Sequence, residues 1–145
     1  MEKRGVSYEP FIYIFIVIVA GLVFIFGFQQ INKLNSLNEQ VIYAEFQSDF
    51  KKAVEEAYSK NQGSVMTFSA QSSNKPLRLP ESIERIYFEV VNGETMIVPS
   101  DSKYHGFVVE NLRAEAQNIK TNGQASFVLE NRVVEGETKV VLKNV

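Results

Sequence analysis

The chain of 145 residues is long enough for one modest domain and a short additional segment. Its formal net charge of -2 gives no electrostatic basis for binding nucleic acid, which requires clustered lysine and arginine. The absence of cysteine from the sequence excludes disulfide bonds, thiolate metal sites and a cysteine nucleophile.

The first predicted element is an apolar helix over residues 10–28. Residues Phe11 to Phe28 carry no charge, and at about 1.5 Å per residue they cover roughly 27 Å, close to the thickness of a bilayer core. Apolar side chains on all sides of a helix favour lipid over the core of a small domain. The run ends without the small-x-small motif of a cleaved secretory signal. We therefore expect it to remain as a transmembrane helix.

Positive charge lies before this span and not directly after it. Lys3, Arg4 and the amino terminus precede the span, whereas Lys33 is the one basic residue in the twenty positions that follow. The positive-inside rule predicts a cytoplasmic tail over residues 1–9 and an extracytoplasmic remainder. The chain is thus expected to be a single-pass protein of the cell membrane.

The helical pattern continues past the span, through residues 29–62. Apolar residues recur every three or four positions opposite polar ones. A first stripe comprises Ile31, Leu34, Leu37, Val41 and Ala44. A second stripe comprises Ile42, Phe46, Phe50, Val54 and Tyr58, joined by Ala53 and Ala57. Packing on the chain's own C-terminal domain is favoured over a coiled-coil seam, because the heptad-like run is short.

Residues 63–145 change to the period-two pattern of strands. Asn92-Gly93, between two β-rich runs, is the strongest hairpin signal, because a type I′ turn needs two residues that tolerate positive φ. Glu135-Gly136 repeats the pattern, and Asn122-Gly123 marks a further turn. Residues 106–119 are ambiguous beyond a strand in their first half. The predicted fold class is α+β, with a long transmembrane-plus-amphipathic helix followed by a small antiparallel β-sheet of five to seven strands.

One loop gathers the residue types of a hydrolase: Ser100, Asp101, Ser102 and His105. A catalytic triad is assembled from distant parts of a chain, and crowding in one loop cannot place a base and its carboxylate around a nucleophile. His105 is the single histidine, so it has no partner for a zinc site. No glycine-rich phosphate loop occurs either. We expect a surface turn, with no catalytic residue, metal, cofactor or small-molecule substrate, in a protein that is not an enzyme.

The N-terminal residues resemble the processing site of type IV pilins and the related pilin-like proteins of archaea. Arg4 and Gly5, followed by Val6 and Ser7, are similar to the archaeal prepilin-peptidase site, in which a basic residue and a glycine precede the cut. The resemblance implies cleavage between Gly5 and Val6, with loss of the leader, residues 1–5, and retention of the apolar helix.

The same resemblance implies a structural function. The chain is expected to be a pilin-like subunit of a surface filament or a filament-associated assembly, anchored in the membrane before assembly. In the bacterial branch a glutamate at the fifth mature position helps to register subunits, whereas here Glu9 is the fourth mature residue. The implied partners are membrane lipid, further copies through the N-terminal helix, and a prepilin-type peptidase. The alternative is an unprocessed single-pass protein whose external β module binds another protein.

Overall fold

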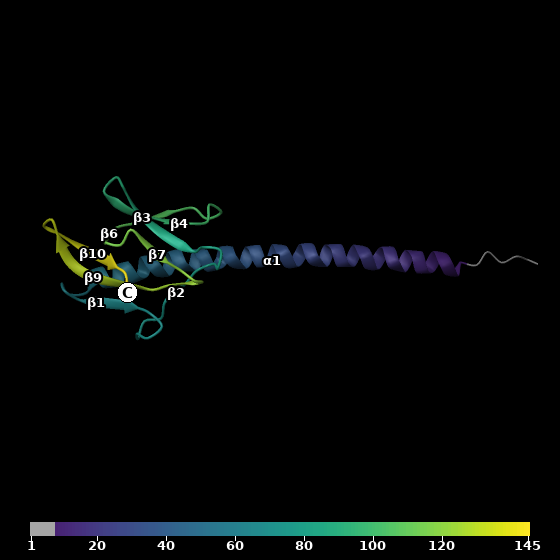
Figure 1. Cartoon of the computed structure of the whole chain (residues 1–145), viewed down its shortest axis with the longest axis horizontal. Coiled ribbons are helices and arrows are strands. Elements are labelled where there is room, and N and C mark those ends of the chain that lie inside the picture. Colours follow the sequence, from purple (N-terminus) through teal and green to yellow (C-terminus); the bar gives the residue numbers. More distant parts are fainter. Residues whose placement is uncertain (1–7) are drawn as a thin grey trace, which may run out of the picture. The chain divides into compact units, whose positions relative to one another are not determined.

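The computed structural model describes residues 8–145 and divides the chain into two compact units, Met1–Asn38 and Glu39–Val145. Helix α1 (Glu9–Ser59) is continuous and contributes to both units (Figure 1). It begins one residue before Pro10, which suits the first helical turn because proline has no amide hydrogen to lose. Gly63, four residues past the helix end, has a φ of 85° and turns the chain toward the first strand.

Ten strands follow α1 in the described part of the chain. They are β1 (Val65–Phe68), β2 (Leu77–Arg78), β3 (Arg85–Val91), β4 (Glu94–Pro99), β5 (Phe107–Val109), β6 (Leu112–Ala114), β7 (Asn118–Lys120), β8 (Gln124–Ala125), β9 (Phe127–Val134) and β10 (Glu137–Lys143). They form three sheets, in the orders β1-β9-β10-β6, β2-β8 and β5-β4-β3-β7. All pairs are antiparallel except β10 with β6, which is parallel.

The expected fold class, α+β with a long helix and a small β domain, is confirmed, but the expected number of strands was too low. Five strands have only two or three residues, which is too short for an alternating pattern to be recognised. The ambiguous stretch of residues 106–119 contains β5, β6 and the start of β7. The domain therefore holds ten strands in three sheets and one parallel pair.

Both hairpins marked by glycine turns are confirmed. Asn92 and Gly93 have φ values of 54° and 82° between β3 and β4, and Glu135 and Gly136 have values of 55° and 87° between β9 and β10. Two successive positive φ values are the requirement of a type I′ turn, which matches the twist of the flanking strands. A third residue other than glycine, Asn111, also has a positive φ, of 58°, in the turn between β5 and β6.

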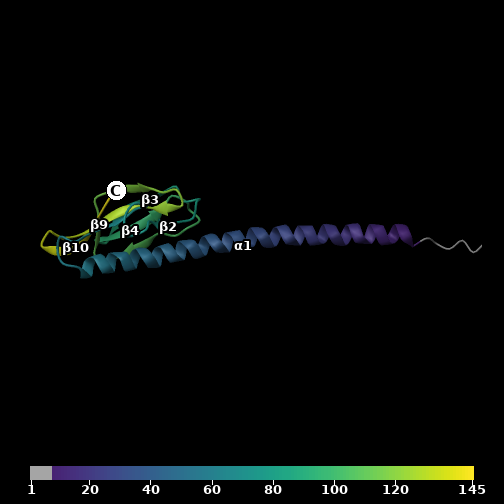
Figure 2. The ribbon, with the colours of Figure 1, turned by 90° about the horizontal axis from the view of Figure 1, so that it is seen from below.

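The C-terminal part of α1 forms one side of the core of the second unit, and Figure 2 shows the strands lying along it. The helical residues buried there are Tyr43, Phe46, Phe50, Ala53, Val54 and Ala57. Phe50 lies 6.3 Å from Phe107 of β5 and 5.2 Å from Phe127 of β9, measured between ring centroids. One aromatic side chain of the helix thus contacts two different sheets.

Two details of the helix prediction were wrong. Tyr58, placed in the second stripe, is 42 % exposed, while Tyr43, assigned to no stripe, is buried. Residues three or four positions apart share a face of a helix. The buried face begins with Tyr43, Phe46 and Phe50, and so it starts at Tyr43 and not at Ile42. The first stripe is exposed: it includes Val41 at 55 % and Leu34 at 62 %.

Candidate functional site

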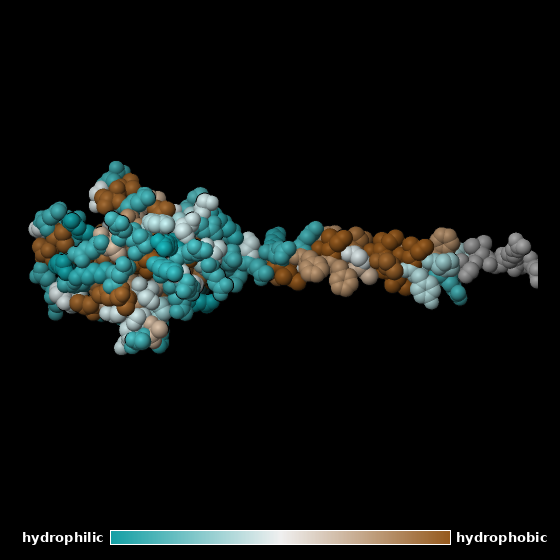
Figure 3. Space-filling view, in the orientation of Figure 1, coloured by the Kyte–Doolittle hydropathy of each residue, from teal (hydrophilic) through white to brown (hydrophobic). Residues whose placement is uncertain are grey.

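Residues 11–28 of α1 carry an unbroken apolar surface. Every described residue from Tyr8 to Asn35 is exposed, and Figure 3 shows the hydrophobic residues gathered along this part of the helix. Phe11, Val17 and Phe24 are 65 %, 70 % and 68 % exposed. Apolar surface of this extent has to be covered by lipid or by other protein. The helix is long enough and apolar enough to cross a bilayer, which makes this surface the main candidate functional site.

The residues that carry the resemblance to pilins lie almost entirely outside the described part. Arg4, Gly5, Val6 and Ser7 belong to residues 1–7, and the structure describes 8–145. Glu9 is the first residue of α1 and is exposed. A carboxylate in the first turn of a helix interacts favourably with the positive end of the helix dipole.

The loop of Ser100, Asp101, Ser102 and His105 is held in place by hydrogen bonds between side chains and backbone amides. Ser100 Oγ accepts hydrogen bonds from the amides of Glu84 and Arg85, both at 3.1 Å. Asp101 Oδ1 accepts one from the amide of Lys103 at 3.0 Å, and this bond lowers the pKa of Asp101. These contacts shape the turn after β4, as expected for serine and aspartate in a surface loop.

The same loop fastens the helix. Lys103 Nζ lies 2.9 Å from Glu39 Oε2, and the Tyr104 hydroxyl donates to the same oxygen at 3.2 Å. The Tyr43 hydroxyl donates to the carbonyl of His105, and the rings of Tyr43 and Tyr104 are 4.7 Å apart. These contacts join the loop to the first residues of the second unit. We call Glu39, Tyr43, Lys103, Tyr104 and His105 the helix latch.

Charge and burial in the helix latch act on its titratable groups. The hydrogen bond from Lys103 lowers the pKa of Glu39, and the carboxylate in turn raises the pKa of Lys103. Burial raises the pKa values of Tyr43 and Tyr104, because the charged phenolate would be poorly hydrated there. Both tyrosines are therefore neutral hydrogen-bond donors at physiological pH.

Asn131 of β9 closes the C-terminal end of α1. Its side-chain amide donates to the carbonyl oxygens of Ala57, Tyr58 and Lys60 at 3.1, 3.0 and 2.7 Å. The last carbonyls of a helix have no partner within the helix, and here a buried side chain provides one. The sequence patterns did not identify this residue. It could have been found from the alternation along β9, which buries Phe127, Leu129 and Asn131. A polar residue at a buried position of a strand needs hydrogen-bond partners.

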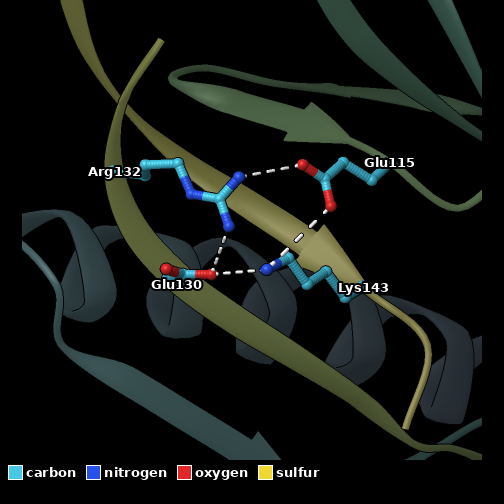
Figure 4. Close-up of polar contacts among 4 residues, drawn as sticks. All are labelled: Glu115, Glu130, Arg132 and Lys143. Carbon is cyan, nitrogen blue, oxygen red and sulfur yellow. Dashed lines mark hydrogen bonds and ion pairs between the residues drawn. The ribbon is translucent and has the colours of Figure 1, made fainter.

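Four charged residues form a closed network on the face of β9 and β10 opposite the core (Figure 4). Arg132 contacts Glu115 at 3.1 Å and Glu130 at 2.8 Å, and Lys143 contacts Glu130 at 2.6 Å and Glu115 at 4.0 Å. The bonds from Lys143 and Arg132 lower the pKa of Glu130. With two charges of each sign, the network is neutral. It holds the segment after β6 against β9 and β10.

Comparisons of the chain with protein-family profiles, curated proteins and solved structures found no match. In the described residues 8–145, no three histidine or acidic side chains are grouped so that they could hold a metal ion.

Proposed function

We propose that the chain is a pilin-like structural subunit, anchored in the membrane by α1 before it assembles into a surface filament or a filament-associated complex. One observation carries this proposal: a single helix joins a segment that is apolar and exposed on every side to a segment that forms the core of a β domain. A subunit that moves from lipid into an assembly of helices needs such an apolar segment in both environments.

Assembly would proceed by exchange of one apolar environment for another. A prepilin-type peptidase would remove residues 1–5 on the cytoplasmic side. The apolar surface of residues 11–28 would then leave lipid and pack against the same surface of neighbouring copies. The β domain would remain outside the membrane, on the surface of the assembly.

Electron microscopy of sheared surface fractions from cells that express the chain tests this proposal. We expect filaments that contain the chain, and we expect them to disappear in a Gly5→Asp variant that blocks processing but still enters the membrane. A chain that stays in the membrane fraction and is released only by detergent, as a monomer or small oligomer, would contradict filament assembly.

The alternative is an unprocessed single-pass protein whose external β module binds a partner. A groove on the second unit, described below, favours this function. Catalysis forms no part of either proposal. Ser100 and Asp101 hold the loop after β4 through hydrogen bonds to backbone amides, and His105 contributes its backbone carbonyl to the helix latch. Ser102→Ala and His105→Ala leave these bonds in place, so we expect both variants to stay folded and membrane-bound.

A further inference from the structure

The inner face of β3 becomes exposed toward the tip of the β3–β4 hairpin. Ile86, Phe88 and Val90 alternate along β3 and share the face that meets the core. Ile86 is fully buried, Phe88 is half-buried, and Val90 is 77 % exposed, the most exposed large apolar residue of the strands. Packing of the core therefore stops before the tip of the hairpin, and the Val90 side chain on the inner face is left exposed.

A groove lies at this place, between the β3–β4 hairpin and the strands β6 and β10. Its main hollow has a volume of about 460 Å³. Leu112, which is buried, and the half-buried Phe88 and Ala114 line it. A second hollow of about 190 Å³ shares Gly93, Leu112 and Lys139 with the first. Figure 1 shows the β3–β4 and β9–β10 hairpins pointing apart on either side.

The groove is strongly acidic. The residues that line its two hollows include five glutamates and two basic residues. Both cations are already paired: Arg113 lies 3.1 Å from Glu135, and Lys139 lies 3.5 Å from Glu137. The other carboxylates have no ion pair among residues 8–145; they are Glu89, Glu94 and Glu110.

This acidity is local. The second unit, Glu39–Val145, contains fifteen Asp and Glu and twelve Lys and Arg, an excess of three negative charges. The residues that line the groove account for all of that excess. The rest of the unit is balanced, so the electrostatic potential of the unit directs cations to the groove.

We propose that this groove docks a cationic segment of a partner protein. An apolar side chain of the segment would cover Phe88 and Val90 on the inner face of β3. Lysine or arginine side chains would lie against Glu110 and would reach around the tip of the β3–β4 hairpin to Glu89 and Glu94, which alternate onto the other face. A metal ion fits less well, because no three of the acidic side chains in the described residues converge on one point. The inference uses the second unit alone and holds whether or not filaments form.

The test is the binding of a short peptide to the full chain in nanodiscs of zwitterionic lipid. The probe is the fluorescein-labelled peptide Lys-Val-Lys-Leu-Arg, and its analogue with glutamate at the three cationic positions is the control ligand. Anisotropy titrations at low and high salt measure the affinity. We expect saturable binding of the cationic peptide, weakened by salt, and none of the acidic analogue.

Two matched double variants identify the site. Glu94→Gln with Glu110→Gln should weaken binding by about tenfold at low salt, because two unpaired charges are lost at the groove. Glu45→Gln with Asp49→Asn removes the same charge from exposed positions of α1 and should change the affinity by less than about twofold. Val90→Ser, which keeps the charges, should also weaken binding.

Three results would overturn the proposal. The first is no saturable binding below about 1 mM. The second is equal affinity for the peptide in the two double variants. The same holds if only Val90→Ser loses affinity, because the groove would then be an apolar surface that does not recognise charge. The third is self-association of the chain that competes with the peptide and is lost in the groove variant, which would assign the groove to a second copy.

Discussion

At the residue scale, Asn131 is the clearest case of one side chain fixing two elements. It lies 74 positions after Ala57 and donates to the end of the helix, while its own backbone pairs with the segment between α1 and β1. The amide of Gly63 donates to the Asn131 carbonyl at 2.7 Å, and the amide of Asn131 donates to the Ser64 carbonyl at 2.9 Å. The end of α1 and the centre of β9 are thus held together by both side chain and backbone.

Replacing Asn131 should therefore destabilise the second unit. Asn131→Leu removes the side-chain donor from three carbonyl oxygens, of which that of Ala57 keeps a 3.4 Å bond from the Lys60 amide, and should cost about 2 kcal/mol. Asn131→Asp should cost more at neutral pH, because a buried carboxylate would face those oxygens, and its stability should recover partly as the pH falls and the acid is protonated. Urea unfolding followed by near-ultraviolet circular dichroism measures both effects. Asn144→Asp, near the exposed C-terminus, is the control and should be neutral; equal losses in all three variants would contradict this account.

The helix latch predicts a dependence on pH. The folded-state pKa of Glu39 is lowered from its ordinary value of 4.5, so the stability that the Glu39–Lys103 pair contributes is present above that value and is lost as the pH falls through the lowered one. Lys103→Met should lower the melting temperature at pH 7 and have a smaller effect at acidic pH. Lys52→Met, at an exposed position of α1, should show no such dependence. A constant difference between Lys103→Met and the wild type at all pH values would contradict the assignment.

At the element scale, α1 has two parts with different requirements. Its residues in the second unit pack aromatic rings against two sheets, whereas its earlier residues expose aromatic rings on every side. A helix with a single amphipathic pattern along its whole length would not show this change. All-round apolarity ends at Phe28 and one-sided burial begins at Tyr43, so the change between them spans the boundary of the two units at Asn38.

Alanine substitutions at the buried Phe50 and the exposed Phe24 should have different effects on the stability of the β domain. Phe50→Ala removes a fully buried ring that contacts Phe46, Phe107 and Phe127, and it should cost about 3 to 5 kcal/mol of unfolding free energy in the β domain. Phe24→Ala, at a 68 % exposed position, should leave that free energy unchanged. Urea unfolding in detergent measures both variants, and a similar loss in each would contradict the division of α1.

The close approach of β5 to β4 depends on Gly106. A Cβ at this position would lie 2.8 Å from the carbonyl oxygen of Ile97 and 2.8 Å from Met96 Cε, and the backbone oxygen cannot move away cheaply. Gly106→Ala should therefore destabilise the domain by about 1 to 3 kcal/mol. Ser102→Ala, in the exposed part of the preceding loop, is the matched control in the same measurement. A neutral Gly106→Ala would show that β5 can shift.

Much of this arrangement could be predicted from local patterns. The apolar run, the helical spacing of Phe46, Phe50 and Val54, and the Asn-Gly and Glu-Gly turns each follow from the requirements of one element. The short strands and the parallel pairing of β6 with β10 could not, because two or three residues carry no period and their pairing depends on distant parts of the chain. The contacts of Asn131 and the groove beside Val90 likewise arise only from tertiary packing.

At the scale of the whole molecule, processing of the N-terminus would decide whether the chain assembles or stays in the membrane. Residues 1–7 lie outside the described part, so the leader-like motif at Arg4 to Ser7 remains a prediction from sequence. The exposed apolar surface of α1 requires a covering environment in either proposal. Processing distinguishes a subunit destined for assembly from a permanent anchor.

The most direct test is the intact mass and N-terminal sequence of the chain purified from its native membrane. The pilin-like account predicts a chain that begins at Val6 and lacks the five residues of the leader. A chain that begins at Met1 or Glu2 would contradict it and identify an unprocessed anchor.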